Sequence, residues 1–166
     1  KDYTVTLSSV AGDPVNFSVG GIAFTMNFVP GGLTFLTGVD DSGPPGTVTD
    51  AYLVGQTEVT YELWNVVKTW ATSNGYTFGN PGRQGGDFDA TNDAVGSVQH
   101  PVTTVNWRDS MVWMNALTEY FNNQNGTSLT CVYYTDSNYS TPIRTSTDAG
   151  STDGTPGSED NPYIKA

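Results

Sequence analysis

The chain has 166 residues, a natural length for one domain, and six Lys and Arg against seventeen Asp and Glu give a net charge of −11. This charge argues against DNA or RNA as a partner, because phosphate binding needs a basic patch, and against attraction to an anionic membrane surface. A single cysteine excludes an internal disulfide framework and a Cys-based zinc cluster, and a single histidine excludes a His-rich metal site within this chain.

The N-terminal third of the sequence predicts β-strands separated by Gly and Pro turns. Apolar and polar residues alternate with period 2 in the first strands, which is typical of half-buried strands. Glycine and proline clusters end each run. The predicted strands are residues 3–8, 15–17, 22–29, 33–38 and 48–54, with a loop at 40–46.

A first helix begins after Thr60, a good N-cap residue, and Glu62 in its first turn faces the positive end of the helix dipole. Asn74-Gly75 is a typical left-handed end for this helix. One apolar face is predicted by the i, i+3, i+4, i+7, i+8 spacing of Leu63, Val66, Val67, Trp70 and Ala71.

A long polar loop from about residue 78 to residue 99 follows and holds five glycines. Asp87, Asp89 and Asp93 lie close together in it, and oxygen-rich loops of this kind can bind Ca²⁺. The pattern lacks the glutamate that completes an EF-hand loop. We therefore interpret the three carboxylates as part of a solvated loop and predict no metal site and no cofactor.

The second helix is predicted by Asn106 as N-cap and Asp109 at the third helical position, a capping-box arrangement. Asn125-Gly126 ends it. Residues 129–134 then predict a strand by their β-branched and aromatic content. The helix has a broad apolar face made of Trp113, Met114, Ala116, Leu117, Tyr120 and Phe121.

The segment Ser146–Asn161 contains hardly an apolar residue, so little burial offsets its ordering entropy, and we predict that it is mobile. Its acidic residues are interpreted as a solvated tail: Asp148, Asp153, Glu159 and Asp160. Residues 162–166 turn apolar again. We expect Tyr163 and Ile164 to pair with, or lead into, a strand of a chain that continues beyond Ala166.

Two residues are candidates for nucleophilic chemistry, and both have a structural interpretation that we prefer. His100 precedes Pro101 at the entry to a short extended run, so a turn residue whose ring holds neighbouring backbone is expected. Cys131 lies in the strand at 129–134 without a local cation to activate it, so a buried, inert thiol is expected. We predict no catalytic residue in the chain.

Three segments, in this order, resemble the N-terminal half of the formylglycine-generating-enzyme (sulfatase-modifying factor) domain family. They are the strand pair around Pro30-Gly31-Gly32, the helix entry Glu58-Val59-Thr60, and His100-Pro101-Val102 with the following Val105-Asn106-Trp107-Arg108-Asp109. The resemblance covers about residues 24–145. It implies an α+β fold of the C-type lectin-like kind, with two helices, a small twisted sheet and much irregular chain.

This resemblance also sets our expected domain organisation and site. We expect one domain over 1–166, incomplete at its C-terminus, with an N-terminal β segment at 1–29, a family-like core at 30–145 and a flexible loop at 146–161. The family's catalytic cysteines and metal ligands lie further C-terminal than its Arg-Leu-Pro-Thr-Glu-Ala-Glu-Trp-Glu run, which is not reached here. None of them is carried onto a residue of this chain, and ligand-binding residues are expected after Ala166.

The segment 130–145 resembles treponemal members of the family, among them the variable proteins of diversity-generating retroelements. This resemblance implies a non-enzymatic surface protein that binds a protein or a small-molecule ligand. The protein would be extracellular or on a bacterial cell surface, and it would attach to a membrane only through a lipid anchor that has been removed from this sequence. Two alternatives stay open. One is a formylglycine-generating-type oxidase, and the other is a purely structural module of a surface lipoprotein.

Overall fold

The computed structural model describes residues 12–38, 42–85, 97–148 and 150–165. Their contacts divide the chain into two compact units. The first comprises the residues up to Phe17 and Ala23–Thr57, and the second comprises Ser18–Ile22 and Glu58–Ala166. The predicted strand at 3–8 lies outside the described residues, and the predicted domain organisation stays a prediction.

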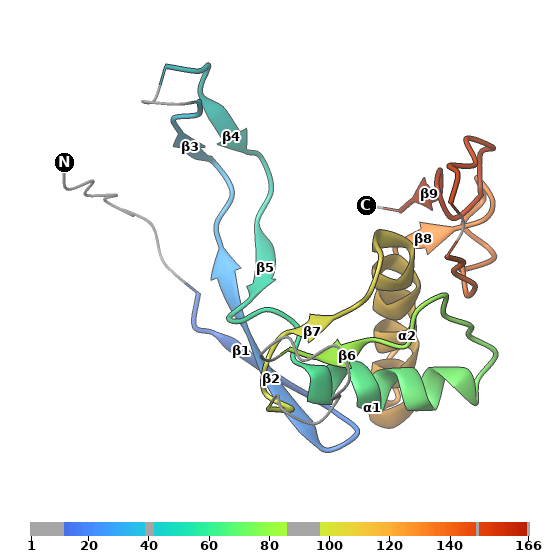
Figure 1. Cartoon of the computed structure of the whole chain (residues 1–166). Helices are drawn as coiled ribbons and strands as arrows, with labels where there is room; N and C mark the ends of the chain where they lie inside the picture. Colours follow the sequence, from blue (N-terminus) through green and yellow to red (C-terminus); the bar gives the residue numbers. More distant parts are fainter. Residues whose placement is uncertain (1–11, 39–41, 86–96, 149, 166) are drawn as a thin grey trace. The chain divides into compact units, whose positions relative to one another are not determined.

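The first unit is made of antiparallel strands (Figure 1). One sheet has the order β1-β2-β5, with β1 at Val15–Val19, β2 at Ile22–Val29 and β5 at Tyr52–Gly55. A two-stranded ribbon pairs β3, Leu33–Phe35, with β4, Gly46–Val48.

The strand predicted at 48–54 is therefore two strands with different partners. Val48 pairs with Leu33 in the ribbon, whereas Tyr52 pairs with Val29 in the sheet. A Cβ on Gly31 would lie 2.7 Å from the Thr49 carbonyl oxygen, so the chain between β4 and β5 passes against the turn that follows β2. The strand predicted at 33–38 ends early, at Phe35.

The tip of the β1–β2 hairpin packs in the second unit. Val19 is fully buried there, and the Gly20 amide donates to Gln124 Oε1 at 2.8 Å. Gly20 has a φ of +59°, and a Cβ at this position would lie 2.5 Å from Val66 Cγ2. Only glycine fits this backbone shape and this close approach.

Two helices form the centre of the second unit, and both predicted starts are confirmed. Helix α1 spans Tyr61–Thr72, with the Thr60 hydroxyl accepting from the Leu63 amide. Helix α2 spans Trp107–Asn125, with the predicted capping box and with Gly126 left-handed at its end. The C-cap of α1 is Ser73, which is right-handed, so the left-handed end predicted at Asn74-Gly75 is wrong for the cap, and Gly75 is left-handed two residues further on.

Two parallel indole rings join the helices. The rings of Trp64 and Trp113 stack with centroids 5.4 Å apart, and Trp113 Nε1 donates to the Trp64 carbonyl oxygen. The prediction that Met114 belongs to the apolar face of α2 is wrong, since this residue is 45% exposed. The buried face of the helix instead includes Met111 and Val112. The buried apolar core comprises Val19, Leu63, Trp64, Val67, Ala71, Tyr76, Met111, Val112, Trp113, Ala116, Cys131, Tyr134 and Ile143.

Short strand pairs complete the second unit, and two of them correct the sequence analysis. Strand β6, Arg83–Gln84, pairs with β7, Val102–Thr103, within the stretch predicted as loop. Strand β8, Tyr133–Tyr134, pairs with β9, Tyr163–Ile164. Tyr163 and Ile164 thus have a partner strand inside this chain, and their pairing with a later segment stays a prediction.

The strand predicted at 129–134 is shorter because α2 takes its backbone groups. Asn115 Oδ1 accepts from the amides of Val132 and Tyr133, and its Nδ2 donates to the carbonyl oxygens of Tyr133 and Ile143. Asn122 binds the amide and the carbonyl of Leu129 in the same way. The side chains of α2 thus satisfy the Leu129 backbone and the Val132 amide ahead of β8, which begins only at Tyr133.

The fully buried carboxylate of Asp109 is the polar centre of the unit. It accepts from the Asn106 amide in its own cap, from the Gly79 and Asn80 amides, from Asn80 Nδ2 and from the Ser146 hydroxyl. Burial raises the pKa of this carboxyl, but the bonds from Ser146, Asn80 and Asn106 outweigh it, so the pKa lies below its ordinary value. Asp109 therefore stays ionised in the folded protein.

Replacing Asp109 by Asn removes the charge and turns an acceptor oxygen into a donor that faces other donors. We expect Asp109→Asn to lower the free energy of unfolding by about 3 kcal/mol in urea titrations, since buried amides lose their acceptor. The matched change Asp50→Asn, at an exposed aspartate, should change it by less than about 0.5 kcal/mol.

The same pair of variants tests the ionisation. A group whose pKa is depressed by folding stabilises the protein above its unfolded pKa, about 3.9, and this stabilisation is lost as the pH falls through the folded value. The stability gap between wild type and Asp109→Asn should therefore shrink below about pH 4. A gap that is constant from pH 7 to pH 3 would contradict an ionised Asp109.

Candidate functional site

His100 holds a turn, as predicted. Its exposed ring donates from Nδ1 to the Gly85 carbonyl oxygen at 2.6 Å, and its own carbonyl accepts from the Tyr61 amide at 2.9 Å. The residue thus links the approach to β7 with the start of α1 and with the end of β6. The interpretation of His100 as a turn residue is confirmed.

Cys131 is buried and inert, as predicted. Only 4% of the residue is exposed, and Sγ lies 3.7 Å from the Asn115 carbonyl oxygen, to which the thiol donates. Burial raises the pKa of the thiol to about 11, with a smaller contribution from the nearby Glu119 carboxylate. At neutral pH the group is a thiol, which is a poor nucleophile.

Asp87, Asp89 and Asp93 lie outside the described residues, so the interpretation of their loop stays a prediction. Within the described ranges, no group of three or more His, Cys, Asp or Glu side chains is placed to hold a metal ion. The helices in the described part of the chain are all too short or too polar to cross a membrane.

The interpretation of the acidic tail as solvated is wrong for Glu159 and Asp160. Arg108, at the first turn of α2, donates to both oxygens of Asp160, from Nε at 2.5 Å and from a terminal nitrogen at 2.9 Å. The Asp160 side chain is only 2% exposed. The hydrogen bonds from Arg108 keep the pKa of the Asp160 carboxyl below its ordinary value. The sequence showed Arg108 at a helix start without any indication of a partner 52 residues away.

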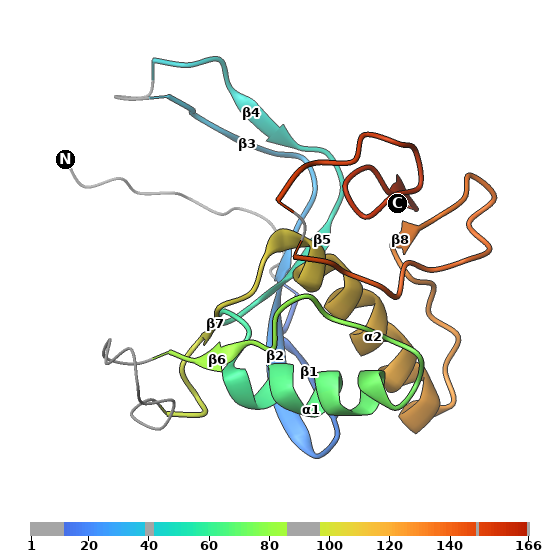
Figure 2. The same ribbon diagram turned by 45° about the vertical axis from the view of Figure 1, so that its right-hand side comes forward.

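Glu159 is attached to the same arginine, since one of its oxygens lies 3.7 Å from Arg108 Nε, and it also accepts from the amide of Thr147 at 2.7 Å and from the Thr147 hydroxyl, within its own segment. The segment of residues 147–160, drawn in orange-red to red, therefore passes the first turn of α2 (Figure 2). Asp148 and Asp153 are exposed, as expected. The predicted mobility of 146–161 stays a prediction, but two of its carboxylates are fixed to the core.

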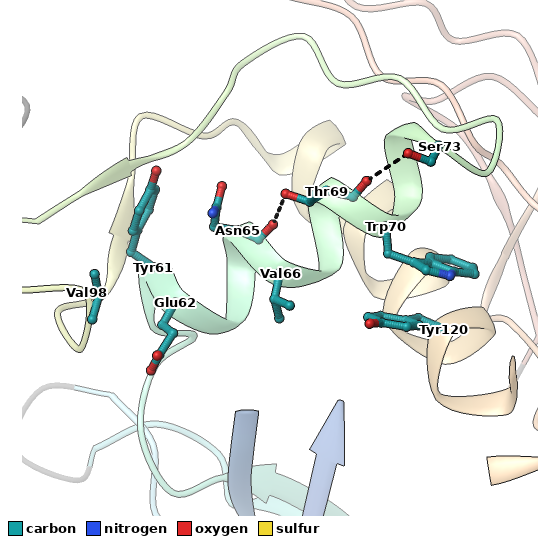
Figure 3. Close-up of a pocket in the computed structure, with 9 residues that line it drawn as sticks. All are labelled: Tyr61, Glu62, Asn65, Val66, Thr69, Trp70, Ser73, Val98 and Tyr120. Atoms are coloured by element: carbon teal, nitrogen blue, oxygen red, sulfur yellow. Dashed lines mark hydrogen bonds between the residues drawn. The ribbon is translucent and has the colours of Figure 1, made fainter. Parts of the chain in front are cut away.

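A groove of about 530 Å³ runs along α1 (Figure 3). Sequence reasoning missed it because Val66 and Trp70 were taken only as core positions of the helix. In the structure both are half-buried and also face the groove. Its lining comprises Tyr61, Glu62, Asn65, Val66, Thr69, Trp70, Ser73, Val98 and Tyr120.

Comparison with known proteins gives similarity at the level of structure. No protein-family model and no curated protein sequence matches the chain. Treponema denticola variable protein 1 is similar over 80% of this chain, with 28% identity and a TM-score of 0.52. The crystal structure of CarF is similar over 73% of it, with 26% identity and a TM-score of 0.51.

The chain spans 41% and 45% of the lengths of these two proteins, which is less than half of each. Two helices with small antiparallel sheets, together with these neighbours, confirm the predicted α+β fold of the C-type lectin-like kind.

The burial of Cys131 predicts slow alkylation of the native protein. With a pKa of about 11 and little exposure, the thiol should react with iodoacetamide at pH 8 at least about 100-fold more slowly than in guanidinium-unfolded protein. Mass spectrometry follows the labelling. Equal rates in the native and unfolded protein would show an accessible thiolate.

The burial of the Arg108–Asp160 pair predicts that loss of the Asp160 charge lowers the urea midpoint far more than loss of the charge of the more exposed Glu119. We expect Asp160→Asn to lower the urea midpoint clearly, because it removes the two-oxygen charged partner of a buried guanidinium and leaves only the Glu159 carboxylate, 3.7 Å from Nε. Glu119→Gln removes the charge opposite Arg144 in a pair that is 42% and 22% exposed, and should change the midpoint little. Equal midpoints for both variants would contradict a structural role for Asp160.

Proposed function

We propose that this chain is the scaffold part of a non-enzymatic, ligand-binding surface protein with a C-type lectin-like fold. One observation carries the proposal: the structural likeness to Treponema denticola variable protein 1, which extends over 80% of the chain. The proposal also rests on the resemblance of residues 24–145 to the N-terminal half of the formylglycine-generating-enzyme domain family.

In this proposal residues 1–166 supply rigidity and not contact with the ligand. The segments that precede β9 bond to α2 through Asp109, which accepts from Ser146, and through Arg108, which donates to Asp160. Binding sites are typically carried on loops that a rigid scaffold positions. The ligand-binding residues are proposed to lie after Ala166 and to be diversified by a retroelement.

The partner is proposed to be a protein or a small molecule. The protein itself is proposed to be extracellular or on the cell surface, where a lipid anchor would attach it to the membrane. The net charge of −11 disfavours a nucleic acid. A formylglycine-type oxidase is the alternative function. Cys131 does not supply a cysteine for it, because a buried thiol with a raised pKa does not suit nucleophilic or redox chemistry, so the oxidase would need cysteines outside these residues.

Sequencing the gene in many isolates tests the proposal. A diversified binder should show substitutions concentrated in the codons after residue 166, while the codons of Arg108, Asp109 and Asn115, the polar residues of α2 that hold the following chain, stay unchanged. Uniformly low variation along the whole gene would contradict diversification.

A turnover assay distinguishes the oxidase alternative from the proposed binder. The full-length protein, loaded with copper and given a cysteine-containing peptide, should form no aldehyde detectable by hydrazide labelling. Aldehyde formation that depends on the metal would replace the binder by the oxidase.

A further inference from the structure

We propose that one face of the β1-β2-β5 sheet is a docking surface for residues 1–11 of the same chain. The surface and the segment both belong to the first unit. The inference starts from the pattern of this sheet and does not depend on the proposed function.

One side of the sheet is apolar throughout the first unit. The rings of Phe17 in β1 and Phe24 in β2 stack with centroids 5.4 Å apart, so these residues lie on the same side. Phe28 shares that side, because it follows Phe24 by four residues in the strand, and its ladder partner in β5 is Leu53. We call this surface the apolar face; its members in the first unit are Val15, Phe17, Phe24, Met26, Phe28 and Leu53.

The apolar face has no cover among the described residues of its unit. None of its members is buried, and neither is any other residue that the structure describes in the first unit. The opposite side is more polar, since it includes Asn27 and the pair in which Thr25 Oγ1 donates to Asn16 Oδ1 at 2.8 Å. This difference between the sides is typical of a sheet that packs one side on a core and keeps the other in water.

The chain enters the first unit directly over this face. A Cβ on Gly12 would lie 3.1 Å from Cγ and Cδ1 of Phe28, so the backbone of Gly12 runs against the Phe28 ring. Phe28 is a member of the apolar face. Residues 1–11 are therefore joined to a point that already lies on the surface they are proposed to cover.

The pattern and the length of the segment match the face. Tyr3, Val5 and Leu7 alternate with polar residues in the strand predicted at 3–8, so one side of that strand is apolar. These residues lie outside the described part of the chain. Six residues of strand are about 20 Å long, enough to cover most of β2, whose eight residues span about 26 Å.

The charge of the first unit disfavours a second copy of the chain as the cover. Residues 2–57 contain five aspartates and no lysine or arginine, and two of these aspartates, Asp13 and Asp50, are exposed in the structure. Two copies that met through this face would bring like charges together without a cation to pair with them. The charges of Lys1 and Asp2 cancel, so the segment 1–11 adds no such repulsion.

Nuclear Overhauser contacts in the wild-type protein test the docking. We expect cross-peaks between the methyl protons of Val5 or Leu7 and the ring protons of Phe24 or Phe28. The stacked rings of Phe17 and Phe24 supply the internal control, because their protons should give cross-peaks in any case. A spectrum that shows the control contacts and lacks every contact to residues 1–11 would overturn the proposal.

Two double variants with the same added charge test which side of the segment faces the sheet. Val5→Asp/Leu7→Asp should uncover the apolar face and raise the fluorescence of the dye ANS at least about threefold, because ANS binds exposed apolar surface. Thr4→Asp/Thr6→Asp changes the other side of the same strand and should leave the fluorescence as in wild type. All four tryptophans lie in the second unit, so their near-UV circular dichroism verifies that this unit stays folded in both variants.

Two further results would overturn the proposal. One is equal ANS fluorescence of the two double variants. The other is a wild-type dimer in sedimentation that Phe24→Asp converts to a monomer, since this result would assign the apolar face to a second copy of the chain.

Discussion

The second unit depends on one buried carboxylate. Asp109 closes the cap of α2, and at the same time it accepts from the chain that follows α1, at Gly79 and Asn80, and from Ser146, 37 residues later. These segments have few apolar side chains with which to attach themselves. A carboxylate with up to four lone-pair sites at a helix N-terminus offers both the acceptors and the favourable helix dipole that their donors need.

The neighbouring Arg108 extends this centre to the end of the described chain. Its bonds to Asp160 bring the residues just before β9 to the same helix start, and Asn115, two turns further, holds the residues just before β8. Helix α2 thereby fixes both strands of the β8–β9 pair through polar side chains. Polar side chains of one helix thus hold irregular chain in the described part of this unit, without a large sheet.

The local parts of this arrangement could be predicted from the sequence, and the distant parts could not. The caps at Thr60 and Asn106 were predicted because a cap is decided by residues three positions apart. The inert Cys131 and the turn at His100 followed from their neighbours. By contrast, Glu159 and Asp160 were read as solvated because nothing near them in the sequence is basic, and their partner lies 52 residues away from Asp160. The strand at 129–134 was predicted too long because Asn122 and Asn115, from another element, bond to the backbone of Leu129 and Val132 ahead of β8.

Amide hydrogen exchange at Gly79 and Asn80 tests the central role of Asp109 most directly. Their amides bond to the Asp109 carboxylate, so their protection depends on an ionised side chain and not on a helix or a sheet. The account predicts that both amides exchange as slowly as core amides of α1 and α2, because they open only when the unit unfolds. Exchange of both amides at the rate of an exposed loop, while the helices stay protected, would contradict it.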